Sequence, residues 1–181
     1  MFFIGIHLIL FKDLFALLLG EKFRSVVFII PMLIFNPMMY TISETTCCGI
    51  VISKKSYLNI VVSLFACLTN LIGNMILVPL YQGSGAAIST GLAYIVFYLA
   101  RTFLSNKYFY VNFHLKKFFV LLVGTVLFAL YNTFVKFNLM TIVFYLLLMV
   151  IFVGLYKSTF IEGIQYLIEY LKKFLKKGQV E

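Results

Sequence analysis

Long apolar runs, separated by short polar stretches, dominate the pattern of the 181-residue chain. A helix needs about 20 apolar residues to cross the hydrocarbon of a bilayer, and six runs reach or approach that length. A transmembrane β-barrel would instead need segments in which apolar and polar residues alternate, and these runs do not alternate. The pattern therefore predicts an all-α membrane protein with about six spans, at residues 2–20, 26–52, 57–80, 85–104, 118–135 and 139–156.

The residues after the sixth run follow a different pattern. Between Thr159 and Gly178, apolar residues recur every three or four positions and lysines occupy the opposite side. This spacing is typical of an amphipathic helix that lies in the headgroup layer; a tail that stays in solution is the alternative. The chain is thus expected to divide into a six-span region, 1–158, and a basic cytoplasmic tail, 159–181.

Composition favours lipid as the solvent of this chain. Hydrophobic residues make up 63% of it and charged residues only 12%, whereas soluble domains carry about 25% charged residues. A soluble protein of this length could not remove so much apolar surface from water. The net charge of +9 comes from lysine clusters between the apolar runs, so we expect anionic membrane lipid, and no nucleic acid, as a partner.

The distribution of basic residues also predicts an orientation, because cytoplasmic loops are enriched in lysine and arginine. Most lysines fall in the segments 53–56 and 105–117 and in the tail. The segments 20–25, 81–84 and 136–138 hold only Lys22, Arg24 and Lys136. We therefore expect a multi-pass protein of the cytoplasmic membrane with both termini in the cytoplasm.

The sequence contains no motif typical of an enzyme. Its two histidines and few acids form no known catalytic or phosphate-binding pattern. Cys47 and Cys48 are adjacent, and neighbouring helical side chains point about 100° apart, so they do not converge on a metal ion. We predict a protein that is not an enzyme and has no catalytic residues, metal or cofactor.

Polar residues inside the predicted spans are the candidates for function. Glu44 would be costly in lipid, so we expect it to contact a substrate or proton, or to make a structural hydrogen bond. Asn70 and Asn74 belong to a polar stripe that either bonds across a helix interface or lines a wet cavity. Arg101 either extends to the inner interface or contacts an anionic headgroup. The whole stripe on the third span comprises Asn59, Ser63, Ala66, Asn70 and Asn74.

The stretch TNLIGNMILVPLYQGSGAAIST at 69–90 resembles a region of the polysaccharide flippases, which belong to the multidrug/oligosaccharidyl-lipid/polysaccharide superfamily. Members show an asparagine pair, a proline, a tyrosine, a glycine turn, and small residues before a threonine. They usually have glycine directly after the tyrosine, where this chain has Gln82 and then Gly83. The segments at 17–23 and 49–56 resemble loops of the same family. The matching residues are Asn70, Asn74, Pro79, Tyr81, Gly85, Ala86, Ala87 and Thr90.

This resemblance implies a specific fold and function. It implies the C-terminal half, spans nine to fourteen, of a MATE-like transporter with fourteen helices. Such a protein moves an undecaprenyl-pyrophosphate-linked oligosaccharide across the cytoplasmic membrane for surface polysaccharide biosynthesis, such as the O-antigen of lipopolysaccharide. Its polar, often cationic cavity shelters the sugar and the pyrophosphate.

The same resemblance implies that this chain is a fragment and is inactive alone. Alternating access requires two lobes that move around a site between them, so we expect a partner: the missing N-terminal half or another copy of the chain. A fragment of a related multidrug or lipid exporter is one alternative. A membrane partner protein without transport activity is the other.

Overall fold

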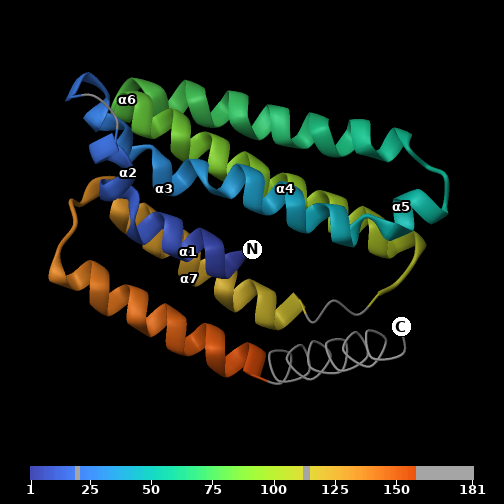
Figure 1. The fold of residues 1–181 in the computed structure, drawn as a ribbon. Helices are drawn as coiled ribbons and strands as arrows, with labels where there is room; N and C mark the ends of the chain where they lie inside the picture. The colour runs from blue at the N-terminus through green and yellow to red at the C-terminus, as the bar shows by residue number, and fades with distance from the viewer. Residues whose placement is uncertain (19–20, 112–114, 158–181) are drawn as a thin grey trace, which may run out of the picture.

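The computed structural model describes residues 1–18, 21–111 and 115–157, and every regular element in these ranges is a helix (Figure 1). No strand occurs among the described residues. The predicted tail helix at 159–178 lies outside them. In chain order the helices are α1 (Phe2–Leu10), α2 (Lys12–Leu18), η1 (Glu21–Phe28), α3 (Ile30–Leu33), α4 (Phe35–Thr46), α5 (Cys48–Ile52), α6 (Tyr57–Tyr108), α7 (Leu115–Phe134) and a last helix, Leu139–Lys157.

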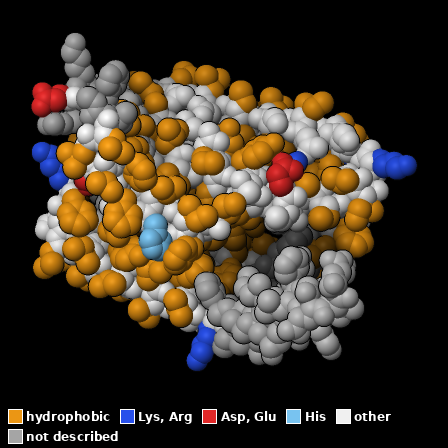
Figure 2. All heavy atoms as spheres, in the orientation of Figure 1, with side chains coloured by type: hydrophobic (Ala, Val, Ile, Leu, Met, Phe, Trp, Pro, Cys, Tyr) orange, Lys and Arg blue, Asp and Glu red, His pale blue; other side chains and the backbone are white. Residues whose placement is uncertain are grey.

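Three of these helices, α6, α7 and Leu139–Lys157, are long and apolar enough to cross a membrane. Their large apolar side chains are widely exposed; Ile60 and Met75 of α6, for example, are each 72% exposed. Figure 2 shows hydrophobic side chains spread over the visible face, with few charged ones between them. Lipid accepts such a surface, whereas water does not. The prediction of a helical membrane protein is therefore confirmed at this level.

Helix α6 consists of two antiparallel arms, residues 57–81 and residues 83–108. They meet at Gln82, whose backbone is not helical (φ 49°, ψ −124°). Pro79 lies just before this break and lacks the backbone donor that a continuous helix would use. The break falls in the predicted turn between the third and fourth spans, so the two arms correspond to those spans.

The two arms pack closely near the turn. A Cβ atom at Gly85 would clash with the backbone carbonyl of Leu77, so only glycine permits this approach. Farther along, the Ser89 hydroxyl donates a hydrogen bond to the backbone carbonyl of Asn70 at 2.8 Å. Small residues such as Gly85 and Ser89 let helices approach closely within a bilayer.

The first two predicted spans are not continuous helices. The first, 2–20, is divided at Phe11 into α1 and α2. The second, 26–52, contains the end of η1, then α3, α4 and α5. Pro31 lies in the first turn of α3, where a missing backbone donor costs little, and Cys47 takes a non-helical conformation between α4 and α5. Hydropathy reports the length of an apolar run, but it does not reveal these local breaks.

The remaining elements pack into a layered bundle around the second arm of α6. Figure 1 shows the first arm of α6 at one side of the bundle and Leu139–Lys157 at the other. Helices α3, α4 and α5 contact α6, while α1 and α3 contact α7. The core between these layers contains the fully buried side chains of Ile6, Met32, Met39, Tyr98 and Phe128. The first arm of α6 contributes little to this core.

Candidate functional site

A cavity of about 790 Å³ lies where the first arm of α6 faces α4 and the second arm. Its volume falls within the usual range of ligand-binding pockets, about 300–1,000 Å³. Its lining is rich in polar groups. The lining residues are Tyr40 from α4, Asn59, Ser63, Ala66, Cys67, Asn70, Leu71 and Asn74 from the first arm, and Ala93, Tyr94, Phe97 and Arg101 from the second arm.

The polar stripe predicted for the third span forms one wall of this cavity. Its five members lie three or four residues apart, which places them on one side of the helix. The Asn70 amide donates to the Thr90 hydroxyl of the second arm at 3.3 Å, and the Asn74 amide donates to Asn70 Oδ1 at 2.6 Å. Asn70 thus bonds to the second arm and also lines the cavity.

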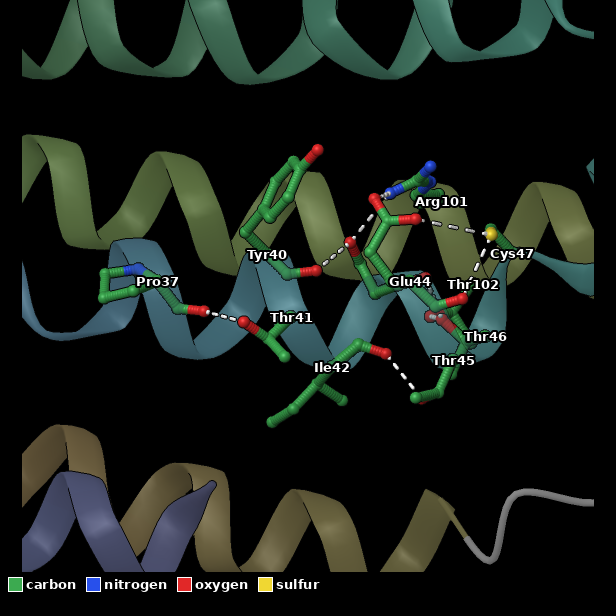
Figure 3. Close-up of polar contacts among 11 residues, drawn as sticks. Pro37, Tyr40, Thr41, Ile42, Glu44, Thr45, Thr46, Cys47, Arg101 and Thr102 are labelled. Carbon is green, nitrogen blue, oxygen red and sulfur yellow. Dashed lines mark hydrogen bonds and ion pairs between the residues drawn. The ribbon is translucent and has the colours of Figure 1, made fainter.

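The structure pairs Glu44 with Arg101 beside this wall. Arg101 Nη1 donates to Glu44 Oε1 at 2.6 Å and to Ser43 Oγ at 3.0 Å. The guanidinium carbon also lies 5.6 Å from the centre of the Phe97 ring. In Figure 3 the side chains of Glu44 and Arg101 point toward each other from α4 and the second arm. This short, charge-assisted contact offsets the cost of each charge in apolar surroundings.

A row of hydrogen bonds holds α4 and α5 against the second arm and so positions this ion pair. The hydroxyls of Thr46 and Thr102 lie 2.8 Å apart, and Thr102 directly follows Arg101 in the second arm (Figure 3). The Gly49 backbone N–H donates to Ser105 Oγ at 2.8 Å. A Cβ atom at Gly49 would clash with the Ser105 carbonyl, so glycine is needed for this contact. The pair thus lies on a well-fixed scaffold.

Three buried polar atoms on cavity-lining residues have no hydrogen-bond partner among the described residues. They are Asn59 Oδ1, Asn74 Oδ1 and Arg101 Nε. A buried polar atom without a partner costs about 1–3 kcal/mol. These atoms are covered in the structure, and rotation of their side chains toward the cavity would let a polar ligand donate to the two amide oxygens and accept from Nε, which would remove this cost. The arrangement is thus suited to bind hydroxyl groups, and it contains no nucleophile–base pair among its lining residues.

The other residues of the 69–90 motif shape the hairpin rather than the cavity. Tyr81 lies just before the turn, and its ring packs edge-on against Phe134, with the ring centres 5.3 Å apart. Ala87 is buried in the core, and Ala86 precedes it on the second arm. Together with Pro79 and Gly85, these residues close the turn and set the distance between the arms. The motif therefore fixes the wall on which Asn70 and Asn74 lie.

Several features of the site were not predicted from the sequence. Tyr40, Tyr94 and Phe97 line the cavity, and in the sequence they look like ordinary lipid-facing aromatic residues. The pairing of Glu44 with Arg101 was also missed, because the two residues are 57 positions apart. A usable signal existed: each is an isolated charge in a long apolar run, and opposite charges within a membrane tend to pair.

Fold and site together define a helical membrane protein with a polar cavity between its helices. Comparison of the chain with protein-family models, with curated proteins and with solved structures gives no match. The resemblance to polysaccharide flippases therefore stays a prediction from the sequence.

Proposed function

We propose that the chain is the C-terminal part of a flippase that moves a lipid-linked oligosaccharide across the cytoplasmic membrane. The observation that carries this proposal is the cavity of about 790 Å³, whose wall includes Asn70 and Asn74 of the flippase-like motif. Sugars carry many hydroxyl groups, and moving these through hydrocarbon without hydrogen bonds is costly. A cavity lined by amides lowers that cost, and translocation breaks no covalent bond.

The proposal includes a second lobe on the open side of the first arm of α6. Apolar side chains on this arm, such as Leu64, Leu68 and Ile72, remain exposed, and few of its residues are buried. A second lobe would cover this side and would convert the cavity into a path between two lobes, as alternating access requires. The missing N-terminal half is the proposed second lobe.

The proposal also includes an orientation, with the turn at Gln82 outside and the loop at Lys55 inside. Single cysteines at these two positions, in a background without other cysteines, would be labelled from the outer face of intact cells. We expect labelling at position 82 and none at position 55, because basic loops stay in the cytoplasm. Labelling at position 55 but not at 82 would overturn the orientation.

Transport itself is tested by reconstitution. The chain would be placed in proteoliposomes with and without the polypeptide encoded directly upstream, together with a fluorescent polyprenyl-linked oligosaccharide. We expect flipping only when both parts are present. Failure of the combined parts would contradict the proposal, and so would robust flipping by the verified monomer. Movement of a fluorescent drug or phospholipid instead would indicate the exporter alternative.

Two variants serve as a matched pair in this assay. Asn70→Leu removes an amide from the cavity wall, whereas Thr69→Val alters the neighbouring residue, which does not line the cavity. We expect the first variant to slow flipping and the second to leave it near the wild-type rate. Equal rates for both variants would show that the cavity is not the path.

A further inference from the structure

The charge of the cavity is compensated. Arg101 is the one charged residue among the described residues that line it, and its Nη1 lies 2.6 Å from Glu44 Oε1. The Glu44 side chain is 46% exposed, so an approaching anion would meet a carboxylate beside the guanidinium. The Nε–H of Arg101 has no partner, but a pyrophosphate that bound there would lie beside the Glu44 carboxylate, and the repulsion between the two anions would oppose binding.

The unpaired polar atoms of the cavity also disfavour an anion. Two of the three, Asn59 Oδ1 and Asn74 Oδ1, are acceptors and need a donor from the ligand. A pyrophosphate at neutral pH offers acceptors almost exclusively, so it cannot satisfy them. Each sugar hydroxyl donates one hydrogen bond and accepts others, so different hydroxyls along an oligosaccharide can pair with Asn59 Oδ1, Asn74 Oδ1 and Arg101 Nε.

The aromatic residues complete a surface suited to a sugar ring. The rings of Tyr40 and Phe97 are stacked with their centres 6.0 Å apart, and Tyr94 lies 6.1 Å from Phe97. Aromatic faces supply large apolar contact area while the tyrosine hydroxyls remain free to bond. A sugar ring likewise has apolar C–H faces and a polar rim of hydroxyls.

From these three observations we infer that the cavity binds the uncharged sugar part of a glycolipid and excludes its pyrophosphate. The inference rests on the proposed function, which it refines by naming the part of the substrate that this chain holds. The pyrophosphate is then left to groups outside this cavity. Sugar recognition by this chain is accordingly independent of the negative charge of the substrate.

Cys67 provides a native reporter, because it is exposed and lines the cavity. In a Cys47→Ser/Cys48→Ser background it is the one remaining thiol, and a bound ligand would shield it from N-ethylmaleimide. The full chain would be purified in a polyoxyethylene detergent, which carries no sugar. The alkylation rate would then be measured with inorganic pyrophosphate, with a panel of neutral disaccharides that includes maltose, and with an alkyl maltoside.

We expect at least one neutral disaccharide to slow alkylation saturably, by about tenfold near ten times its Kd, and pyrophosphate to leave the rate unchanged. The alkyl maltoside is expected to act at lower concentration than maltose if the sugar is presented from the membrane. Protection by free sugar but not by the glycolipid would contradict a glycolipid ligand. Protection by pyrophosphate, or by no sugar in the panel, would overturn the inference.

Charge variants test the cause of this selectivity. Glu44→Gln leaves Arg101 uncompensated, so pyrophosphate should now slow alkylation severalfold. Glu44→Gln/Arg101→Gln removes both charges, and pyrophosphate should again have no effect, while the sugar should still protect but more weakly, because the Nε donor is lost. Unchanged behaviour of Glu44→Gln towards pyrophosphate would refute the compensation. If Glu44→Gln alone fails to fold, the neutral double variant still tests sugar binding.

Asn59→Leu tests the proposed hydrogen bonds, because the Asn59 side chain makes none within the described part of the chain. This variant should weaken sugar protection severalfold, measured against its own alkylation rate without ligand. These binding measurements are separable from transport. Protection by sugar without flipping in the reconstituted pair would refute the flippase alone, while flipping together with pyrophosphate protection would refute the sugar inference alone.

Discussion

Gln82 occupies a backbone conformation that suits glycine, and replacing it with glycine should stabilise the protein. Its φ of 49° and ψ of −124° match the first central residue of a type II′ turn, a position dominated by glycine. The neighbouring Gly83 has no positive φ, because none of the described glycines does. Glycine would therefore fit best at position 82, directly after Tyr81, where the flippases usually have glycine. In this chain the glycine comes one residue later, at position 83.

The expected gain follows from two opposing terms. A side chain forced into such a conformation costs about 1–3 kcal/mol, while glycine adds about 0.5–1 kcal/mol of conformational entropy to the unfolded chain. Gln82 is exposed and its side chain makes no hydrogen bond within the described residues, so little is lost with it. Gln82→Gly should therefore raise the unfolding free energy by about 0.5–2 kcal/mol.

Thermal unfolding in mild detergent, followed by far-ultraviolet circular dichroism, would measure this gain. For a chain of this length we expect Tm to rise by about 2–4 °C per kcal/mol. Gln82→Ala keeps the Cβ atom and should change little. Ser84→Gly, in the helical start of the second arm, should lower stability by about 0.5–1 kcal/mol. A Tm for Gln82→Gly at or below that of the wild type would refute the strain at this turn.

Three further predictions follow from other contacts. Lys12→Met should lower the unfolding free energy by about 1.5–3 kcal/mol, because the buried Lys12 ammonium donates to the carbonyls of Asn132 and Val135 at the end of α7. Faster amide exchange at the end of α7 would support this prediction, and unchanged exchange would contradict it. Arg101→Gln should lower the unfolding free energy by a similar amount. Glu44→Gln/Arg101→Gln should lower it by less than the sum of the losses in the two single variants; if thermal unfolding shows that these losses add, the two residues are not coupled. Asn70→Leu should lower the unfolding free energy by about 1–2 kcal/mol, because the Asn70 amide bonds to the second arm. Asn59→Leu should cause no loss, because it removes a buried oxygen without a partner; equal losses would count against a buried role for Asn70.

The parts of the fold that the sequence predicted are those determined by local pattern. The two arms of α6 appeared as two apolar runs separated by Pro79 and a glycine turn, and the break at Gln82 falls between them. The stripe containing Asn70 and Asn74 also follows directly from helical spacing, so its alignment on one wall of the cavity was predictable. The helices α7 and Leu139–Lys157 lie within a few residues of the fifth and sixth predicted spans.

The parts that were not predicted depend on tertiary packing. Whether Asn70 bonds to a neighbouring helix or faces a cavity is decided by where the second arm and α4 lie, and the sequence left both alternatives open. The pairing of Glu44 with Arg101 requires α4 to lie along the second arm, an arrangement that hydropathy does not encode. The division of the first predicted span at Phe11 likewise accompanies the anchoring of Lys12 on α7, a contact between residues more than a hundred positions apart.

The central claim is that the cavity beside the first arm of α6 holds the sugar while the lipid is flipped. It is tested most directly by blocking that cavity in the active two-part complex, with Cys67 as the one cysteine of this chain and a bulky maleimide as the blocking group. A matched complex would keep Cys48 instead, which is exposed but does not line the cavity. We predict that modification of Cys67 stops flipping of the fluorescent glycolipid, that excess glycolipid slows this inactivation, and that modification of Cys48 leaves flipping unchanged. Full flipping after complete modification of Cys67 would contradict the account.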